Sequence, residues 1–159
     1  MPLRPATARD AALLWNVLLE AYNWTGEQRF TVERLAADPH AARYLSGWPR
    51  EDDFGVVAET ETGEPVGAAW ARRLPEDAPG YGFVAPDVPE LTLAVLPAHR
   101  GRGHGRALMT ALIRSAADRS TTRLSLSVED GNPAVHLYAS LGFTPVGRNG
   151  GSDTMLLAL

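Results

Sequence analysis

Residues 91–117, LTLAVLPAHRGRGHGRALMTALIRSAA, decide the fold. Large apolar side chains at every second position from Leu91 to Val95 are typical of a strand with two different faces. Pro97 ends this strand, because it has no N–H group to donate to a neighbouring strand. Beyond the glycines, apolar residues recur at helical spacing to the end of the stretch. We therefore expect a helix that begins near Gly103 and packs one apolar face against a sheet.

Three glycines at every second position lie between Arg100 and Arg106, where the expected strand turns into the expected helix. The first N–H groups of a helix have no partners within it, and the helix dipole adds partial positive charge there. Such a turn can bind phosphate. No Lys-Ser or Lys-Thr pair follows the glycines, and their spacing differs from the G-x-G-x-x-G of dinucleotide folds, so both of those phosphate sites are disfavoured. The alternative interpretation is a glycine-rich connection without a ligand.

A second motif, NPAVHLYASLGF, extends from Asn132 to Phe143. Asn132 is a good helix N-cap, Pro133 a good first helical residue and Gly142 a good terminating residue. The motif therefore predicts a short helix that leads into a strand. Another strand is expected just before it, at residues 124–128. Because a helix separates that strand from the first one, the two should be parallel neighbours joined by a right-handed crossover.

The rest of the chain predicts further strands and helices around these two motifs. Thr7 offers a helix N-cap, with Asp10 as its acidic partner three residues later, ahead of an apolar helical stripe. The other expected elements are a helix from residue 39 to near Gly47, a hairpin of strands at 54–59 and 66–72, a long loop at 74–89, and strands at 143–147 and 154–159 joined by a loop at 148–153.

The composition favours a single globular domain over residues 1–159. Apolar residues make up 45% of the 159-residue chain, which is ordinary for a globular protein. The net charge of −4 disfavours nucleic acid as a partner. The chain has no cysteine, which excludes disulfides and an acyl-cysteine intermediate. No segment has the length of a signal-peptide core or of a membrane span, so we expect no membrane association and a cytoplasmic location.

Both motifs resemble those of one enzyme family. Arg100, Gly103 and Gly105 fill the positions of [Arg/Gln]-x-x-Gly-x-[Gly/Ala], the acyl-CoA-binding signature of the GNAT superfamily of N-acetyltransferases. Residues 132–143 are similar to the last helix of that family and the strand after it. Together the motifs cover roughly residues 90–147, and they stand in the order that the family has.

The resemblance implies a fold and an activity. The fold would be α/β of the α+β type: a mixed, mostly antiparallel seven-stranded sheet, flanked by about four helices, with a splayed pair of parallel strands. The activity would be direct, sequential transfer of an acetyl group from acetyl-CoA to a primary amine of a small molecule or peptide, without a metal. Homodimers are frequent in the family, so a homodimer is the expected candidate for an assembly.

The resemblance also implies roles for individual residues. The pantetheine arm of acetyl-CoA would pair with the backbone of the first strand, and its pyrophosphate would lie on the amides of the glycine loop. Asn132 would help to hold the pantetheine arm or the thiol end, and Tyr138 would be the general acid that meets the leaving thiolate. The residues implied to bind the cofactor are Leu93, Ala94, Val95, Arg100, Gly101, Arg102, Gly103, His104, Gly105, Arg106 and Asn132.

The residues themselves leave alternatives open at three positions. Glu90 is the candidate base that takes the proton of the amine through water, and an exposed glutamate at the end of a strand is the alternative. Asn132 caps its helix with or without a ligand. Tyr138 falls on the buried face of its helix, so a core tyrosine is the alternative to a general acid. The N–H group of Val95 is the candidate donor to the developing oxyanion.

No motif identifies the acceptor, which we expect to be bound by residues 22–50, 75–90 and 148–153. The acidic candidates for attracting a cationic amine are Glu27, Asp77, Asp87 and Asp153, and the aromatic candidates, for which core packing is the alternative, are Trp15, Tyr22, Trp24 and Trp48. His99 and His136 are expected to face solvent. A non-catalytic acyl-CoA-binding sensor or scaffold domain is the second hypothesis for the function.

Overall fold

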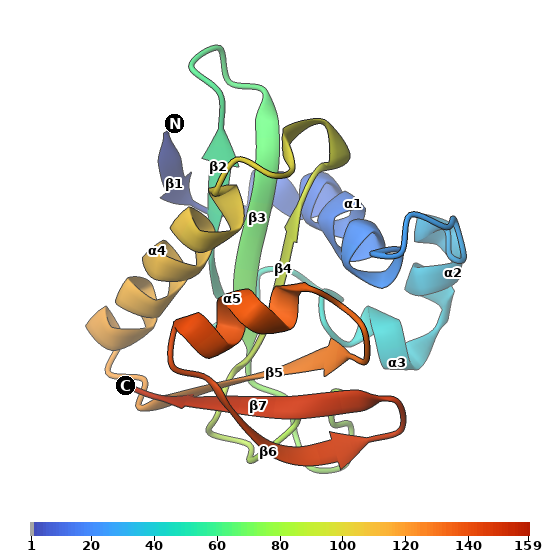
Figure 1. The fold of residues 1–159 in the computed structure, drawn as a ribbon, viewed down its shortest axis with the longest axis vertical. Helices are drawn as coiled ribbons and strands as arrows, with labels where there is room; N and C mark the ends of the chain where they lie inside the picture. The colour runs from blue at the N-terminus through green and yellow to red at the C-terminus, as the bar shows by residue number, and fades with distance from the viewer. Residues whose placement is uncertain (1) are drawn as a thin grey trace.

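Seven strands form one sheet in the computed structural model, which describes residues 2–159 (Figure 1). The strands are β1 (Leu3–Pro5), β2 (Phe54–Glu59), β3 (Pro65–Arg72), β4 (Glu90–Val95), β5 (Arg123–Glu129), β6 (Thr144–Asn149) and β7 (Ser152–Ala158). Their order across the sheet is β1-β2-β3-β4-β5-β7-β6, and β4 and β5 are the parallel pair among antiparallel neighbours. The expected mixed, mostly antiparallel sheet is confirmed.

Helices cover both faces of the sheet. They are α1 (Ala11–Tyr22), α2 (Val32–Ala37), α3 (Pro39–Ala42), α4 (His104–Asp118) and α5 (Ala134–Ser140), five within residues 2–159 where about four were expected. Leu108 of α4 and Tyr138 of α5 belong to the core on one face, and Leu14 of α1 belongs to the core on the other. Because side chains alternate along a strand, β2 gives Val56 to the first core and Val57 to the second.

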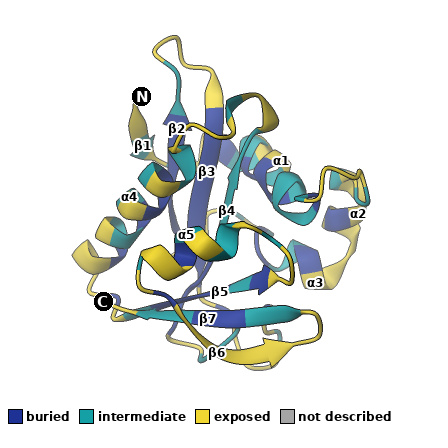
Figure 2. Ribbon diagram, viewed as in Figure 1, coloured by how far each residue is buried: buried dark blue, intermediate teal, exposed yellow. Residues whose placement is uncertain are grey.

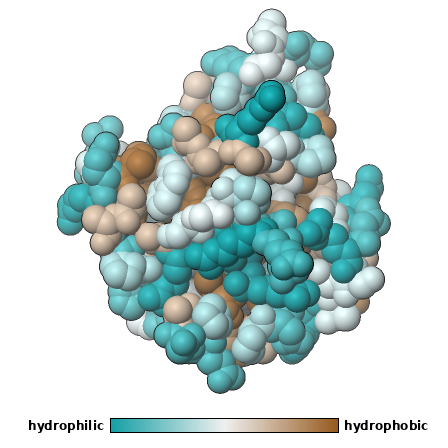
Figure 3. Space-filling view, turned by 180° about the vertical axis from the view of Figure 1, so that it is seen from behind, coloured by the Kyte–Doolittle hydropathy of each residue, from teal (hydrophilic) through white to brown (hydrophobic). Residues whose placement is uncertain are grey.

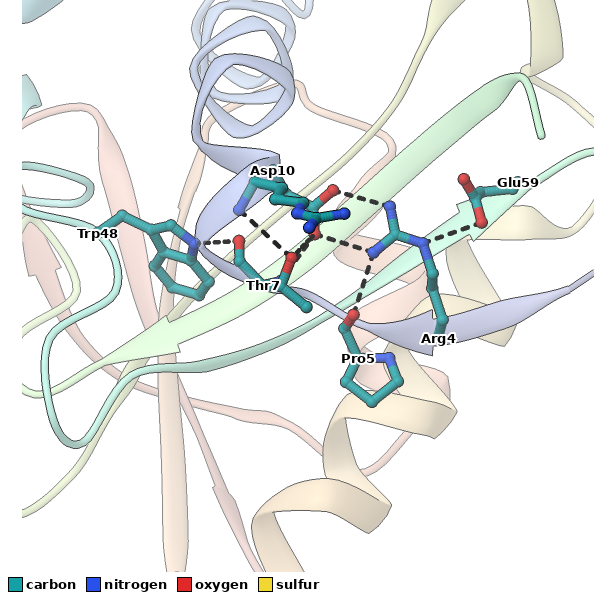
Figure 4. Close-up of polar contacts among 7 residues, drawn as sticks. Arg4, Pro5, Thr7, Asp10, Trp48 and Glu59 are labelled. Atoms are coloured by element: carbon teal, nitrogen blue, oxygen red, sulfur yellow. Dashed lines mark hydrogen bonds and ion pairs between the residues drawn. The ribbon is translucent and has the colours of Figure 1, made fainter.

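A polar network fixes the start of α1 (Figure 4). Thr7 and Asp10 form a reciprocal cap around the 3₁₀ turn that leads into the helix, and the Asp10 carboxylate accepts the N–H of Thr7 at 2.7 Å. Arg4 of β1 binds Asp10 at 2.7 Å and Glu59 of β2 at 2.9 Å. Trp48 donates its indole N–H to the carbonyl of Thr7. The predicted cap is confirmed, and it also ties α1 to the first two strands.

β4 and β5 separate soon after they begin. Glu90 lies opposite Ser125 in the one register pair between them, whereas β4 pairs with β3 along its whole length, from Glu90 to Val95. Figure 1 shows β4 running beside β3 while β5 runs across the molecule beside β7. The splayed parallel pair is therefore confirmed, and most of the β5-facing edge of β4 has no strand beside it.

The segment expected to be a helix from residue 39 to near Gly47 is helical only to Ala42, where α3 ends, and continues as turns. The buried guanidinium of Arg72 explains the difference. It donates hydrogen bonds to the carbonyls of Arg43 (3.1 Å) and Ser46 (2.8 Å), which lie in these turns. A contact from a distant strand therefore shapes a segment whose local pattern favours a longer helix.

The segment at 148–153, expected to be a loop, is mostly strand. β6 extends to Asn149 and β7 begins at Ser152, so the connection shrinks to two glycines. Gly150 has a φ of 61°, the left-handed conformation that tight hairpin turns require. The pair of glycines at 150–151 was the signal for a tight turn that sequence reasoning did not use.

Burial differs strongly between the two halves of the sheet. β3 is buried along most of its length, whereas β6 is exposed along all of it (Figure 2). The exposed large apolar side chains among residues 2–159 are Leu3, Tyr81, Val146 and Leu159. They come from separate elements, and Figure 3 shows strongly apolar residues only in small separate spots on the rear face. The expected homodimer therefore stays a prediction.

Candidate active site

A cavity of about 590 Å³ opens where β4 and β5 separate. Its walls include residues 91–95 of β4 on one side and residues 126–129 of β5 on the other. We call the part formed by the turn before α4 the loop end, and the part near Glu90 the aromatic end. The loop end is lined by Arg100, Gly101, Gly103, His104 and Gly105, and the aromatic end by Tyr22, Trp24, Phe30, Tyr44 and Tyr81.

The loop end is built from main chain. Gly101 and Gly103 have φ angles of 78° and 81°, in the left-handed region that glycine adopts without strain, and α4 begins at His104. Apart from the adjoining residues of the chain, no atom of residues 2–159 lies within 4 Å of the position that a Cβ would take on either glycine. The surface of the turn is therefore open above the first amides of α4, where the helix dipole favours an anion. This geometry suits the phosphate cradle expected between Gly101 and Arg106.

The main chain of β4 alternates between β3 and the cavity. The N–H of Leu96 donates to the carbonyl of Val66 at 2.8 Å, which fixes the alternation. Ala94, two residues earlier, therefore also directs its N–H and C=O toward β3, whereas Leu93 and Val95 direct theirs toward the cavity. Of the three positions expected to pair with a pantetheine arm, Leu93 and Val95 offer main-chain groups to the cavity, and Ala94 does not.

The three arginines of the loop have different surroundings. Arg100 lines the cavity and donates hydrogen bonds to the last carbonyl of β4 (3.0 Å) and to Glu20 of α1 (3.0 Å). Arg106 donates to the hydroxyl of Ser140 in α5 at 2.9 Å. Arg102 is exposed, and neither it nor Arg106 forms part of the cavity wall. Arg100 is thus the arginine best placed to meet a ligand at the loop end.

Asn132 and Tyr138 both line the cavity. The side-chain oxygen of Asn132 accepts the N–H of Ala134 at 3.0 Å, which confirms its capping role at α5. Tyr138 is only 7% exposed and packs edge-on against Phe143, with 6.1 Å between the ring centroids. Burial raises the pKa of Tyr138 to about 12, so its hydroxyl keeps its proton at neutral pH. Tyr138 is therefore both a core residue and part of the cavity wall.

Glu90 is buried at the first residue of β4, with 4% of its surface exposed, so the alternative of an exposed strand-end glutamate is wrong. Its Oε2 accepts hydrogen bonds from the Tyr44 hydroxyl at 2.5 Å and from the Gly82 N–H at 3.1 Å. Burial raises the pKa of Glu90 to about 7, because the ionised carboxylate loses its hydration, and the two hydrogen bonds oppose part of that rise. A carboxyl group with a pKa near neutrality is suited to general acid–base chemistry.

The aromatic end draws its side chains from segments far apart in the sequence. The rings of Tyr22 and Phe30 pack edge-on at 5.3 Å between centroids. Trp24 donates its indole N–H to Glu129 at the end of β5 (3.1 Å), and Arg29 lies 3.6 Å from the same carboxylate. All five residues line the cavity, so the loop after α1 reaches across to β5 and closes this end.

The three regions expected to bind the acceptor all contribute to the cavity wall. The aromatic candidates divide, because Tyr22 and Trp24 line the cavity whereas Trp15 and Trp48 pack against the core of the α1 face. None of the four acidic candidates lines the cavity, where carboxyl groups from other positions lie instead. Tyr44 was not singled out from the sequence, because no local motif surrounds it.

The histidines behave differently from one another. His136 is exposed as expected, but the side chain of His99 is only 12% exposed and lines the cavity, so the expectation for His99 is wrong. The 3₁₀ turn at Pro97–His99 brings the ring of His99 to 6.3 Å from that of His104.

Within residues 2–159, no three His, Asp or Glu side chains gather closely enough to hold a metal ion. No helix in the same range is both long and apolar enough to cross a membrane.

Relatives of similar sequence carry the name of an acetyltransferase. The chain is 38% identical over 143 residues to the mycothiol acetyltransferase of Amycolatopsis mediterranei, an alignment that covers 88% of this chain and 44% of that protein. It is 31% identical over 142 residues to the mycothiol acetyltransferase of Nocardia farcinica, which covers 87% of this chain and 43% of that protein. The chain therefore spans less than half the length of these relatives.

Solved structures share the fold along the whole chain. A ribosomal-protein-alanine N-acetyltransferase from Brucella melitensis superposes with a TM-score of 0.71 at 25% identity, over 100% of both chains. A phosphinothricin acetyltransferase from Sinorhizobium meliloti, solved with AcCoA, gives 0.72 at 22% identity over 99% of this chain and 88% of the other, a likeness of fold alone. The sequence profile of the acetyltransferase (GNAT) family matches residues 15–143. On this match, the sequence relatives and the splayed sheet, the chain belongs to the acetyltransferase (GNAT) family.

Proposed function

We propose that this chain is an N-acetyltransferase that moves an acetyl group from acetyl-CoA directly to a primary amine of a small molecule or peptide. One observation carries the proposal: a single cavity joins the open amides of the loop end to the buried carboxyl group of Glu90, and Tyr138 lines the same cavity. Both predicted catalytic side chains and the predicted phosphate cradle therefore share one space.

The residues at the loop end suit acetyl-CoA as a substrate. The amides between Gly101 and Arg106 would hold its diphosphate, since no side chain covers them on the two left-handed glycines. The main-chain groups of Leu93 and Val95 would pair with the amides of its pantetheine arm, as an added strand pairs with a free sheet edge. Asn132 lies in the same wall and would contact the thiol end.

The chemistry needs a neutral amine, and the cost of reaching it depends on the acceptor. A lysine-type amine with a pKa near ~10.4 is handicapped by about 4.6 kcal/mol at pH 7, whereas an α-amine near ~8 is handicapped by only about 1.4 kcal/mol. Glu90 would accept the proton, directly or through water, because burial holds its pKa at about 7.

Two further groups would stabilise charge as the bonds change. The N–H of Val95, which points into the cavity, would donate to the carbonyl oxygen as negative charge develops on it. Tyr138 would donate its proton to the sulfur of the leaving thiolate, and its raised pKa keeps that proton available throughout the neutral range.

The acceptor is the finer part of the proposal. The sequence relatives are named for mycothiol, which supports including a mycothiol-type amine among the candidates. The structural neighbours are named for a ribosomal-protein alanine and for phosphinothricin, two chemically different acceptors on one fold. Fold alone therefore does not select among small amines, amino acids and peptide N-termini.

The test is thiol release from acetyl-CoA across a panel of primary amines that includes all of these classes. We expect at least one amine to give saturable release, with the acetyl group recovered on that amine by mass spectrometry. Calorimetric binding of acetyl-CoA without release on any amine would support the non-catalytic sensor or scaffold instead. Absence of both binding and release would reject both functions.

A further inference from the structure

Glu90 and Asp53 are buried carboxyl groups on the same face of the sheet, yet they have different partners. Arg72 lies directly opposite Glu90 in the register of β3 and β4, so its side chain emerges beside that of Glu90. It nevertheless turns to Asp53, which it grips with two hydrogen bonds of 3.0 Å and 2.6 Å. Its remaining bonds go to carbonyls of the segment that contains Tyr44. The nearest buried cation is therefore committed, and the hydrogen bonds to Glu90 come from neutral donors.

Tyr44 is the centre of those contacts. Its hydroxyl donates to Oε2 of Glu90 at 2.5 Å and accepts the N–H of Tyr81 at 2.7 Å, while Gly82 donates its N–H to the same Oε2 at 3.1 Å. Its own carbonyl accepts the indole N–H of Trp70 at 3.0 Å. Three segments of the chain therefore meet at one hydroxyl and one carboxyl group, a fourth binds the carbonyl of Tyr44, and Tyr44 itself is only 5% exposed.

The two oxygens of Glu90 are not equivalent in this arrangement. Oε2 has two donors, whereas Oε1 is buried and accepts no hydrogen bond from residues 2–159. Gly80 lies against it so closely that a Cβ there would overlap Oε1 and stand 2.6 Å from the Tyr44 hydroxyl. A buried carboxylate oxygen without a donor destabilises the ionised form of the group. Because Glu90 lines the cavity and its Oε2 already has two donors, Oε1 is the oxygen with free capacity to take a proton.

We propose that Tyr44 is a positioning residue for the acetyl transfer: it holds Oε2 of Glu90 and the loop at 80–82 in place, so that Oε1 is the oxygen that takes the proton of the acceptor amine. This inference rests on the proposed function. In the reaction the N–C bond forms and the C–S bond breaks. The proton lost by the amine reaches Oε1, one proton passes from Tyr138 to sulfur, and exchange with solvent restores both groups.

Removing the Tyr44 hydroxyl should change the pH dependence of the reaction. The titratable groups that face Glu90 are the hydroxyls of Tyr44 and of Tyr22 from α1, while Arg72 from β3 is bound to Asp53. Because the bond from Tyr44 favours the ionised carboxyl, its loss should raise the pKa of Glu90 further. A hydrogen bond to a charged group contributes roughly 1.5–3 kcal/mol, which corresponds to about one pH unit or more.

The experiment compares Tyr44→Phe, which keeps the buried ring, with the wild type and with Trp48→Phe. Trp48 packs against the same core without lining the cavity and loses one hydrogen bond, to Thr7, so it is a matched control for packing effects. We expect the acidic limb of the kcat/KM profile to move up by about one pH unit in Tyr44→Phe only, with an unchanged Kd for acetyl-CoA. Profiles that superpose, or a uniform loss at every pH, would overturn the proposal.

Two measurements separate this inference from the proposed function. A carbon-13 NMR titration reads the pKa of the Glu90 carboxyl directly, without an acceptor, and it should rise in Tyr44→Phe. An unmoved pKa overturns the inference even if thiol release is found. Absence of release on any amine rejects the proposed function, and with it the role of Tyr44 in the transfer, even if the pKa moves. With Glu90→Gln already present, Tyr44→Phe should lower turnover no further, because Tyr44 acts through Glu90. A full additive loss in the double variant would contradict that route.

Discussion

The two ends of the cavity are built by different means. The loop end uses mainly main chain from one short stretch, residues 100–105, with left-handed glycines that keep the amides uncovered. The aromatic end uses side chains from the end of α1, the loop after it, the turns after α3, the loop before β4 and the end of β5. One end can be specified by a local motif, whereas the other exists only after distant segments have packed together.

This difference indicates how such a fold can keep one substrate and vary the other. A cradle of amides depends on backbone conformation, which a few glycines and one helix start are enough to fix. A pocket of side chains changes with every substitution in its lining, without disturbing the sheet.

The largest effect on activity should come from Tyr138, which lines the cavity but belongs to neither the loop end nor the aromatic end. Tyr138→Phe removes the proposed proton donor to sulfur but keeps the buried ring that packs against Phe143. General acid catalysis contributes about 10²–10⁴-fold, so kcat should fall by that order while the Kd for acetyl-CoA stays near the wild-type value. Steady-state thiol release and calorimetry measure the two quantities. Full activity in this variant would remove Tyr138 from the mechanism and leave it as a core residue only.

The sequence predicted the loop end far better than the aromatic end. The strand, glycine turn and helix at residues 91–117 are local, so periodicity and glycine spacing were enough to place them. The cap at Asn132 and the stop at Gly142 are local as well, and both are confirmed. The divergence of β4 from β5 was predicted only from the resemblance to the GNAT family. The residue pattern of one strand does not indicate from which neighbouring strand it separates.

The contacts around Glu90 lay beyond the sequence for a physical reason. Tyr44 is separated from Glu90 by 46 positions, and the bond between them depends on turns that Arg72 holds. The acidic candidates failed in the same way: Asp153 pairs with Arg148 at 2.8 Å on the surface. Charge and residue type suggested which groups could act, but only packing decides which of them face the cavity.

Breaking the support of the aromatic end should affect stability more than any single change at the loop end. Arg72→Met leaves the carboxylate of Asp53 buried without its partner, which costs about 3–5 kcal/mol of unfolding free energy. It also frees the carbonyls that shape the segment of Tyr44. Urea denaturation measures the loss. The double variant Arg72→Met with Asp53→Leu should recover much of it, and no recovery would mean that the hydrogen bonds to the carbonyls matter more than the ion pair.

Glu90, at the aromatic end of the cavity, should make the protein less stable as the pH rises. A glutamate that ionises near 4.5 when unfolded ionises near 7 in the fold, so stability is fully present below about pH 4.5 and is lost as the pH rises through about 7. The shift corresponds to roughly 3 kcal/mol. Glu90→Gln cannot ionise, so it should gain stability relative to the wild type between pH 5 and pH 8 while losing activity. A difference in Tm between the two proteins that is the same at pH 5 and at pH 8 would contradict the raised pKa of Glu90.

The smallest expected effect is on the affinity for acetyl-CoA, and it separates the backbone conformation of a loop-end glycine from its contact with the ligand. Gly103 and Gly150 both have left-handed φ angles, 81° and 61°. In the part of the chain that the structure describes, only adjoining residues come within 4 Å of the position that a Cβ would take on either glycine. Alanine at either position should therefore cost a similar amount of stability, about 1–2 kcal/mol. Gly103 borders the cavity whereas Gly150 lies in the β6–β7 turn, so Gly103→Ala alone should weaken acetyl-CoA binding, by about tenfold or 1.4 kcal/mol. Equal affinities in the two variants would show that the open surface above the glycines is not where the diphosphate lies, because the added methyl group stands on that surface in one variant only.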